Sequence, residues 1–351
     1  MNIIFCLLLL SSCTSSVLSA DVNDGLVLLK IKEQLGNPQE LSNWVEGFQF
    51  CGGSAFSTNN FVIQCTSTGH VKNLIIEDIM APSAPFPEAI CDLAELEELN
   101  LVLLYNLYGP IPSCISQLSN LNFFSIYSTG LSGSLPESLF LNHQKLTDLI
   151  LSSNAISGSI PASLSTIPNL HYLDLSNNSL TGTIPPALVH SQDLVHGQLV
   201  SLKLSDNRLT GEIPKCYQWL PLSTIDIHNN QLTGDPSFLL SKENIYVINL
   251  SHNDFEFDLS NVEISKTLRG LNLGFNKIYG KVPQSIASTR FYNNLDLRNN
   301  NLCGEIPQRE AYPWQPFEVS IFANNKCLCG SPLPPCYNPG PAPSSPPPAA
   351  D

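Results

Sequence analysis

The sequence predicts an α/β solenoid, a right-handed superhelix with short parallel strands on its concave face and a cysteine-stapled cap at each end. Three observations lead to this fold class: a leucine-led segment that recurs over more than 200 residues, an LxL alternation inside each copy, and cysteines in both terminal segments. A repeat sustained at a fixed period is the signature of a stacked architecture. Residues 71–308 therefore form ten repeats of one long domain.

The strands are predicted from the leucines. The copies begin at Val71, Leu96, Leu121, Leu146, Leu170, Leu199, Leu222, Ile245, Leu268 and Tyr292, so that successive starts are 23 to 29 residues apart. Each opens with LxxLxL, and most continue as xxNxLxGxIPxxL, which is the leucine-rich-repeat pattern. Because side chains alternate along a strand, Leu173 and Leu175 face inward and Asp174 faces outward. Only stacking gives such coils a core.

The turn after each strand is predicted from an asparagine, a glycine and a proline. The asparagine recurs at Asn154, Asn178, Asn207, Asn230, Asn253, Asn276 and Asn300. Its side chain supplies both a donor and an acceptor for the buried backbone of the turn. Gly182 permits a tight turn, and Pro185 fixes φ on the return side. We interpret these residues as scaffold.

The segments outside the repeats have distinct compositions. Residues 1–20 are interpreted as a signal peptide, because the apolar run IIFCLLLL precedes the small residues Ser19 and Ala20. Residues 21–70 are expected to form an N-terminal cap, in which GLVLLKIKEQLG has helical spacing. Residues 309–337 are expected to form a C-terminal cysteine cap, and residues 338–351 a disordered proline-rich tail. No later apolar run is long enough for a transmembrane segment.

The cysteines favour disulfides in an oxidising compartment. Of 11 cysteines, Cys6 and Cys13 belong to the predicted signal, which leaves nine. The candidate pairs are Cys51 with Cys65, Cys91 with Cys114, Cys303 with Cys327, and Cys329 with Cys336. Cys216 is left over, either buried or free for a partner, and burial is the expectation. Metal binding by Cys327 and Cys329 is a rival interpretation, disfavoured because no histidine lies close.

Several irregular stretches carry a resemblance to a known family. The second repeat has an insertion in YNLYGPIP, the seventh reads LTGDPSFLL, the eighth NDFEFDLSNVE, and the last cap NNKCLCGSPLPPC. From about residue 21 to 336, this order resembles the plant polygalacturonase-inhibiting proteins. The chain departs from them in three ways: it lacks their first cysteine, it has Cys51 alone where they have a pair, and it is acidic, with a net charge of −14.

The resemblance implies a secreted protein of the plant cell wall and apoplast. It implies binding, by the concave strand face, to a polygalacturonase that a fungus or an insect secretes, and it implies plant defence. Relatives with the same plan include floral regulators and an ice-binding protein. Two alternatives therefore stay open: a soluble receptor-like regulator of development or immunity, and, less favoured, an ice-binding protein.

The outward strand positions predict an acidic face. The acids there are Glu77, Asp78, Glu97, Glu98, Asp148, Asp174, Asp206, Asp226 and Asp296, against four bases, Lys72, Lys203, Arg269 and Arg298. Because a pectin-cleaving enzyme binds a polyanion, parts of its cleft should be basic, and an acidic face would complement them. Aromatic side chains would then be the anchors. The predicted partner-binding residues are Asp148, Tyr172, Asp174, Lys203, Asp206, Asp226, His228, Tyr246 and Arg269.

Other functions are disfavoured by the composition and the motifs. No nucleophile, base and orienting group occur in a recognised arrangement, so we expect no catalytic residues and no enzyme. The histidines lack metal-ligand spacing, and no cofactor is implied. The chain shows no basic patch for nucleic acid. Asn177 and Asn249 match the glycosylation acceptor pattern. We expect a monomeric glycoprotein.

Overall fold

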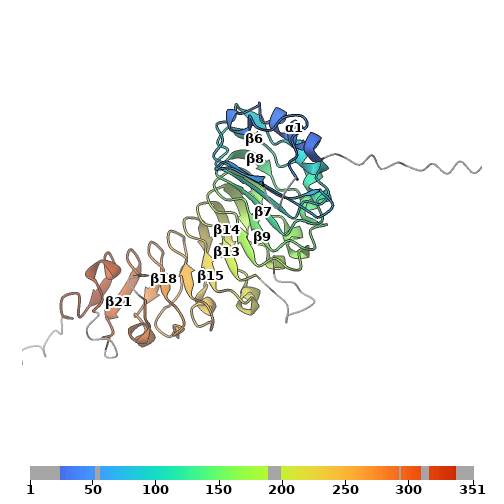
Figure 1. Cartoon of the computed structure of the whole chain (residues 1–351). Helices are drawn as coiled ribbons and strands as arrows, with labels where there is room; N and C mark the ends of the chain where they lie inside the picture. The colour runs from blue at the N-terminus through green and yellow to red at the C-terminus, as the bar shows by residue number, and fades with distance from the viewer. Residues whose placement is uncertain (1–23, 52–55, 189–198, 292–293, 310–315, 337–351) are drawn as a thin grey trace, which may run out of the picture.

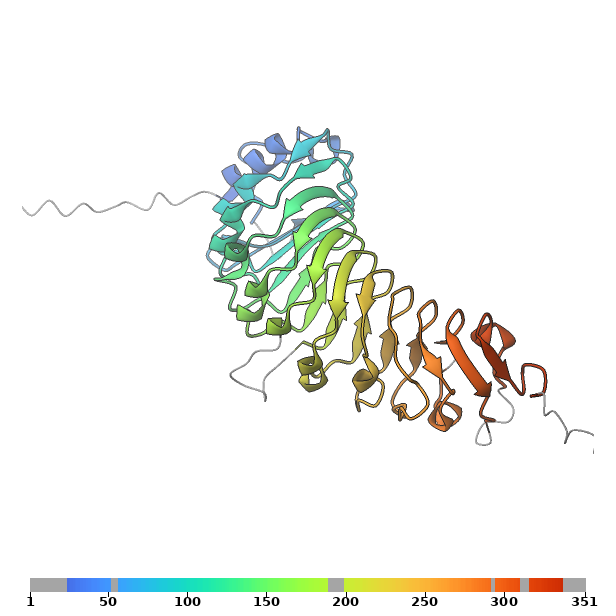
Figure 2. The ribbon, with the colours of Figure 1, turned by 180° about the vertical axis from the view of Figure 1, so that it is seen from behind.

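The computed structural model describes residues 24–51, 56–188, 199–291, 294–309 and 316–336. Their coils stack into an elongated solenoid, as the sequence predicted (Figure 1). The coils that follow β13 (Ser201–Lys203) lie in a nearly straight row, whereas the N-terminal coils fan around a tighter curve (Figure 2). The predicted signal peptide and tail lie outside the described residues. No helix in the described ranges is both long and apolar enough to cross a bilayer.

One long sheet runs through the whole solenoid and contains one strand from each repeat. Its members, in spatial order, are β1 (Phe56–Ser57), β2 (Phe61–Cys65), β3 (Val71–Glu77), β5 (Glu98–Val102), β7 (Phe123–Tyr127), β9 (Asp148–Ile150), β11 (Tyr172–Asp174), β13 (Ser201–Lys203), β15 (Thr224–Asp226), β17 (Val247–Asn249), β18 (Gly270–Asn272) and β20 (Leu295–Asp296). From β3 onward all pairs are parallel and follow chain order. The antiparallel β1 and β2 extend the sheet into the N-terminal cap.

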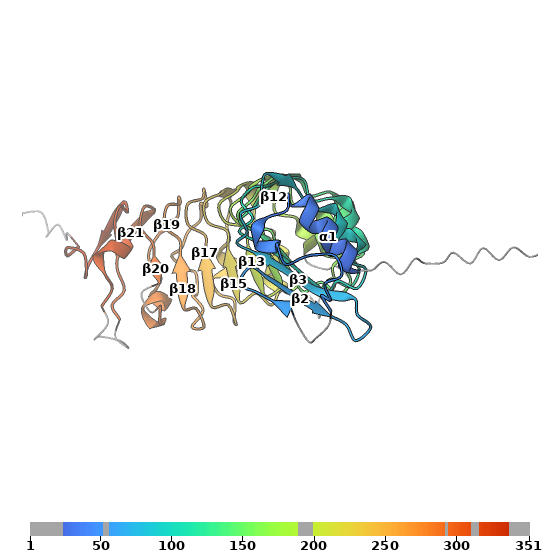
Figure 3. The same ribbon diagram turned by 45° about the horizontal axis from the view of Figure 1, so that its top comes forward.

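Further strands, which the sequence analysis did not anticipate, form a second row beside the long sheet (Figure 3). They are β4 (Ala84–Pro85), β6 (Leu107–Gly109), β8 (Gly130–Ser134), β10 (Ala155–Ser159), β12 (Ser179–Thr183), β14 (Arg208–Glu212) and β16 (Gln231–Thr233), followed by a separate group, β19 (Tyr279–Gly280), β21 (Asn301–Glu305) and β22 (Cys327–Cys329). The LxGxI stretch is extended here because its leucine packs inward while its flanking residues pair with the next coil. The glycine sits at positive φ, 78° for Gly182.

Short 3-10 helices complete the coils. They are η2 (Glu88–Asp92), η3 (Ser113–Gln117), η4 (Glu137–Phe140), η5 (Ala162–Thr166), η6 (Pro186–Leu188), η7 (Lys215–Trp219), η8 (Ser237–Leu239) and η9 (Gln284–Ser288), with η1 (Gln39–Leu41) and η10 (Val319–Phe322) in the caps. A proline directly precedes most of them, such as Pro112 before η3. Proline suits this position because its ring fixes φ and a helix start leaves the N–H group unpaired in any case.

The leucines and the asparagines play the parts that the repeat pattern predicts. Leu149, Leu173 and Leu202 are fully buried in one continuous core. The Nδ2 group of Asn178 donates to Leu175 O of its own coil, at 3.2 Å, and to Leu151 O of the preceding coil, at 2.9 Å. Its Oδ1 accepts from the backbone N–H of Ile156 at 3.0 Å. Each such side chain thus satisfies buried backbone groups of two coils at once.

The two caps are closed by different means. In the N-terminal cap, α1 (Asp24–Gln34) packs above the first coil, and five aromatic rings, Trp44, Phe48, Phe50, Phe56 and Phe61, form edge-to-face and tilted pairs. A single disulfide, Cys51–Cys65, supports them. Phe50, next to Cys51, belongs to this aromatic cluster. The cap therefore combines one disulfide with an aromatic core.

The other disulfides have the pairing inferred from spacing. Cys91–Cys114 joins η2 to η3, while Cys303–Cys327 and Cys329–Cys336 staple the C-terminal cap. Cys216, in η7, is an unpaired thiol that is half-buried, not buried as expected, because it lies on a short outer helix. Its Sγ lies 3.6 Å from Pro186 O.

Candidate partner-binding face

Outward side chains of the long sheet form two rows across neighbouring coils. In the first row, Phe123, Asp148, Tyr172, Ser201, Thr224, Val247 and Gly270 are consecutive partners. In the second row, Ile150, Asp174, Lys203, Asp226, Asn249, Asn272 and Asp296 are partners in the same way. Because every strand is fixed by the core beneath it, these side chains are positioned before any partner arrives.

A third line of residues, which we call the exit row, lies where each strand ends. Its members all have positive φ, between 50° and 58°: Asp78, Leu103, Ser128, Ser153, Asn177, Asp206, Asn229, His252, Phe275 and Asn299. The left-handed conformation favours asparagine and aspartate and disfavours bulky side chains. The row therefore combines residues that suit this backbone with two, Leu103 and Phe275, that do not.

Tyr172, Asp174 and Lys203 form a cluster on strands β11 and β13. The Lys203 ammonium lies 5.1 Å from the centre of the Tyr172 ring and 4.0 Å from a carboxylate oxygen of Asp174. Its pKa is raised, chiefly by the Tyr172 hydroxyl and also by Asp174 and Asp226. Asp174 is only 8% exposed, and both the hydroxyl and the backbone N–H of Ser176 donate to it. Asp174 was predicted to contact a partner directly, but it lies beneath its neighbours and is better placed to position them.

His228 links the sixth and seventh coils. Its Nδ1 lies 2.7 Å from Asp226 Oδ1, and its Nε2 lies 3.3 Å from Asp206 Oδ2. Asp226, the first cause, and then Asp206 raise the pKa of His228 against the opposing effect of burial. In the protonated state both ring N–H groups donate to carboxylates, which fixes the imidazole between them. All three side chains were predicted to bind a partner, and the structure brings them together.

The charge of the face changes along the solenoid. Repeats 4 to 7 present Asp148, Asp174, Asp206 and Asp226 against Lys203, so the centre is acidic as predicted. Repeats 8 to 10 present Arg269 and Arg298 against Asp296 among their described residues. Tyr246 and Arg269 are exposed on these later coils, and Arg298 pairs with Asp296 at 2.9 Å. The sequence average, nine acids against four bases, concealed this change.

A hollow of about 360 Å³ opens in the later part of the face. Its walls include Val247, Asn249, Asn272, Asn294 and Asp296, and Gly270 forms part of its floor. The hollow exists because Gly270 holds a first-row position where neighbouring strands carry side chains. Sequence reasoning passed over this residue, although a glycine at an outward position of the aligned repeats was a visible signal.

Close to the hollow, three side chains stack along the exit row and beside it. The rings of His252 and Phe275 lie parallel, with centroids 4.0 Å apart, and the Arg298 guanidinium lies 5.4 Å from the Phe275 ring on the next coil. Phe275 is 37% exposed. The three residues form a ridge of aromatic and cationic groups beside the strands.

The two glycosylation acceptors lie in different surroundings. Asn177 is exposed in the exit row, where its side chain donates to Ser153 Oγ. Asn249 is half-buried in the second row, and its Oδ1 accepts from the hydroxyl and the backbone N–H of Ser251. A sugar on Asn249 would stand in the middle of the face, whereas one on Asn177 would stand at its border.

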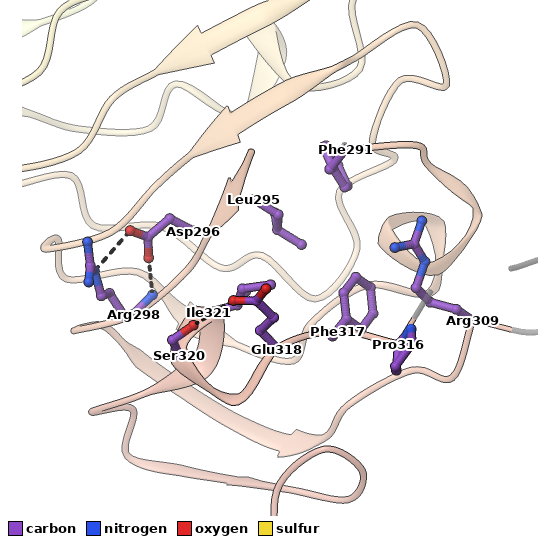
Figure 4. A pocket seen from close by; sticks show the side chains of 10 residues that line it. All are labelled: Phe291, Leu295, Asp296, Arg298, Arg309, Pro316, Phe317, Glu318, Ser320 and Ile321. Atoms are coloured by element: carbon purple, nitrogen blue, oxygen red, sulfur yellow. Dashed lines mark hydrogen bonds and ion pairs between the residues drawn. The ribbon is translucent and has the colours of Figure 1, made fainter. Parts of the chain in front are cut away.

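A second hollow, of about 200 Å³, lies in the C-terminal cap (Figure 4). Phe291 and Phe317 line it, and the Arg309 guanidinium lies 4.9 Å from the Phe317 ring. The Asp296–Arg298 pair stands at its other end (Figure 4). Two of its lining residues, Arg309 and Pro316, flank in sequence the residues outside the described ranges, so we assign it no role.

Comparisons with known proteins agree with this architecture. Residues 144–187 match the family model described as Leucine Rich repeats (2 copies), and residues 198–220 match Leucine Rich Repeat. Polygalacturonase inhibitor 2 of Arabidopsis thaliana is 38% identical over 334 residues, covering 94% of this chain and 96% of that protein. The chain belongs to the polygalacturonase-inhibitor family. Polygalacturonase inhibitor 2 of Phaseolus vulgaris is 39% identical over 338 residues, with 95% of each chain covered.

Solved structures extend the comparison. A plant ice-binding protein superposes with a TM-score of 0.79 at 34% identity, covering 90% of this chain and 97% of that chain. The chain thus shares most of its architecture with a protein whose name describes ice binding. The fold alone does not distinguish the two, so function must be argued from the faces of the solenoid.

Proposed function

We propose that this chain is a secreted plant defence protein that binds and inhibits the cell-wall-degrading polygalacturonases of fungi or insects. It acts in the cell wall and apoplast as a binding protein and not as an enzyme. The observation that carries the proposal is a concave face with an acidic centre, on a chain that matches named polygalacturonase inhibitors over almost their whole length.

The chemistry of the face fits such a partner. Polygalacturonases cleave a polyanion, so their clefts need basic groups, and acids such as Asp148 and Asp226 complement them. Charge complementarity of this kind accelerates association and excludes wrong partners. Tyr172 and Tyr246 supply ring surface of the type that anchors protein interfaces. Preformed strands reduce the entropy that binding would otherwise cost.

The predicted residues divide into two roles. Those proposed to touch the enzyme are Asp148, Tyr172, Lys203, Asp206, Asp226, His228, Tyr246 and Arg269. Asp174 holds Tyr172 and Lys203 in place from below. Glycosylation at Asn177 is compatible with this binding mode, whereas glycosylation at Asn249 would obstruct it.

An inhibition assay tests the proposal. Residues 21–351 would be secreted from plant cells and mixed with a panel of purified fungal and insect polygalacturonases, and release of reducing ends from pectin would be measured. Slower cleavage by at least one enzyme is expected. Full activity of every enzyme across a wide panel would overturn the proposal and favour a receptor-like ligand-binding regulator.

One observation favours ice binding as a second candidate. The second sheet carries small polar side chains on several neighbouring strands, where Ser134 pairs with Ser157, Ser159 with Thr181, and Thr183 with Thr210. The concave face carries bulky aromatic and charged side chains and is too irregular to match ice. The second sheet carries mainly small polar side chains. Glu212 and Arg208 interrupt it. A thermal-hysteresis measurement decides: an activity removed by Thr181→Tyr would support ice binding, and its absence would exclude it.

A further inference from the structure

Neither Gly270 nor Phe275, both on the ninth coil, is required by the backbone conformation or by the packing of the fold. A Cβ added at Gly270 would meet Asn294 Cβ at 3.5 Å and Val247 at 3.7 Å, which are ordinary van der Waals distances. The backbone there does not adopt the left-handed conformation that requires glycine. Neither space nor backbone therefore demands a glycine at this position, although glycine is a poor strand residue. Its evident effect is the hollow above it.

Phe275 poses the opposite problem on the same coil. Its φ of 57° is a conformation that bulky side chains rarely adopt, while Asn229 and Asn299 hold the same exit-row position on nearby coils. Strained backbone conformations persist mainly where function uses them. The phenyl ring does not pack in the core: Phe275 is 37% exposed, and its ring contacts His252 and Arg298.

We propose that the ninth coil is a docking point for one projecting side chain of a protein partner, an aromatic or branched aliphatic residue that enters the Gly270 hollow beside an acidic residue. This inference rests on the proposed function and names what the partner presents. Val247, which is 39% exposed, supplies an apolar wall, and the amides of Asn249 and Asn272 bound the hollow. A volume of about 360 Å³ is within the range of pockets that hold compact ligands.

Charge selects the acidic neighbour. Arg269 is exposed next to Gly270, and its Nη1 donates to the carbonyls of Lys266 and Leu268, which holds the guanidinium on this border. Arg298 lies on the tenth coil and pairs with Asp296. Of the two positive charges, on Arg269 and Arg298, Asp296 therefore offsets one. The partner surface is therefore patterned: basic opposite repeats 4 to 7, and apolar with an acidic residue opposite repeats 8 to 10.

Substitutions of both residues test the docking point with the intact secreted chain. Gly270→Leu fills the hollow and is expected to weaken inhibition of a sensitive polygalacturonase about tenfold or more, with an unchanged Tm. Ser159→Leu adds the same side chain to the second sheet and should leave inhibition unchanged. Equal inhibition by wild type and Gly270→Leu would overturn the inference while the proposed function stood.

Phe275→Asn gives a second, sharper contrast. It replaces a strained residue by one that suits the backbone, so we expect an equal or higher Tm together with weaker inhibition. Leu103→Asn is the matched control: it relieves the same strain in the same row on the second coil, and it should leave inhibition unchanged. A lower Tm for Phe275→Asn would show that the ring serves packing, and it would overturn the inference.

A peptide selection that uses no polygalacturonase separates this inference from the proposed function. A phage-displayed library of random peptides would be selected on wild type and counter-selected on Gly270→Leu. Enriched peptides with an aromatic or aliphatic residue next to Asp or Glu support the docking point, even if no polygalacturonase is inhibited. Peptides that bind both proteins equally, or no enrichment, would contradict it.

Discussion

The first three coils and the later coils solve the same turn differently. From the fourth repeat onward an asparagine such as Asn207 sits inside the turn and bonds the backbone of two coils. In the first and second repeats the equivalent positions hold the buried Ile79 and Leu104, although Asn106, two residues after Leu104, donates to Ala81 O. In the third repeat Thr129 bonds Asn154. The strands β3, β5 and β7 span five to seven residues, against two or three for the later ones. One repeat pattern thus tolerates either polar or apolar filling.

The lesson concerns where stability resides. The later coils depend on buried hydrogen bonds that join neighbouring coils, whereas the first coils depend on apolar packing beneath an aromatic cap. A buried polar group stabilises only when all its partners are present. Each region should therefore lose stability when its polar or apolar turn residue is replaced by the opposite kind.

The largest effect is expected from Asn207→Ala. The Asn207 amide is 9% exposed, donates to three carbonyls and accepts from Leu180 N–H. Its removal leaves buried backbone groups unpaired and should lower the free energy of unfolding by about 3–5 kcal/mol. Urea denaturation followed by circular dichroism measures this. A loss below about 1 kcal/mol would show that the ladder contributes little.

Leu104→Asn tests the reverse exchange, in which a polar residue is placed in an apolar turn of the first coils. Leu104 is 1% exposed in an apolar turn, so asparagine there would be buried away from the carbonyl arrangement of the later coils. We expect a loss of about 2–3 kcal/mol in the same denaturation assay. A stability equal to wild type would mean that the first coils can form the ladder and simply lack its residue.

Much of this could be predicted from the sequence. The strands, the inward leucines and the ladder follow from the period of the repeat, because each imposes a local requirement on every coil. The second sheet was missed, because its extended residues have no pattern of their own beyond the GxIP turn. Asn325, which continues the ladder into the cap by donating to Leu297 O at 3.0 Å, was missed because it stands outside the counted repeats.

The face was harder to predict than the coils. The alternation of side chains along a strand correctly predicted that Asp148 and Asp226 face outward. It could not show that Ser176, Tyr172 and Lys203 cover Asp174. Side-chain contacts between coils depend on the register of strands that are 23 to 29 residues apart in sequence. For the same reason the contact of His228 with Asp206 emerged only when the sixth and seventh coils were placed side by side.

The smallest expected effect is on the pH dependence of stability, to which two histidines contribute in opposite directions. His228 has a pKa raised above 6.5 by Asp226, so its protonated form stabilises the fold. That contribution is complete below about pH 6.5 and is lost as pH rises through the folded-state pKa. Burial lowers the pKa of His143 below 6.5, so the fold gains stability as pH rises toward 6.5.

Thermal melts from pH 5 to pH 9 should therefore separate the two side chains. His228→Gln should flatten the decline of Tm above pH 6.5 and leave the acid limb unchanged. His143→Gln changes a fully buried site, so it should lower Tm at every pH, but it should change the slope of the profile only on the acid limb. A decline above pH 6.5 that persists in His228→Gln would assign it to another group.

The central claim is that the acidic concave strands, and not the charge of the molecule as a whole, bind the partner. Two charge-reversal triples separate these possibilities: Asp148→Lys, Asp206→Lys and Asp226→Lys on the face, and the exposed Glu212→Lys, Glu256→Lys and Glu305→Lys outside the long sheet. Both triples change the net charge equally. We predict that the first abolishes inhibition of a sensitive polygalacturonase and that the second changes it by less than about twofold. Equal losses in the two triples, or inhibition retained by the first, would contradict the account.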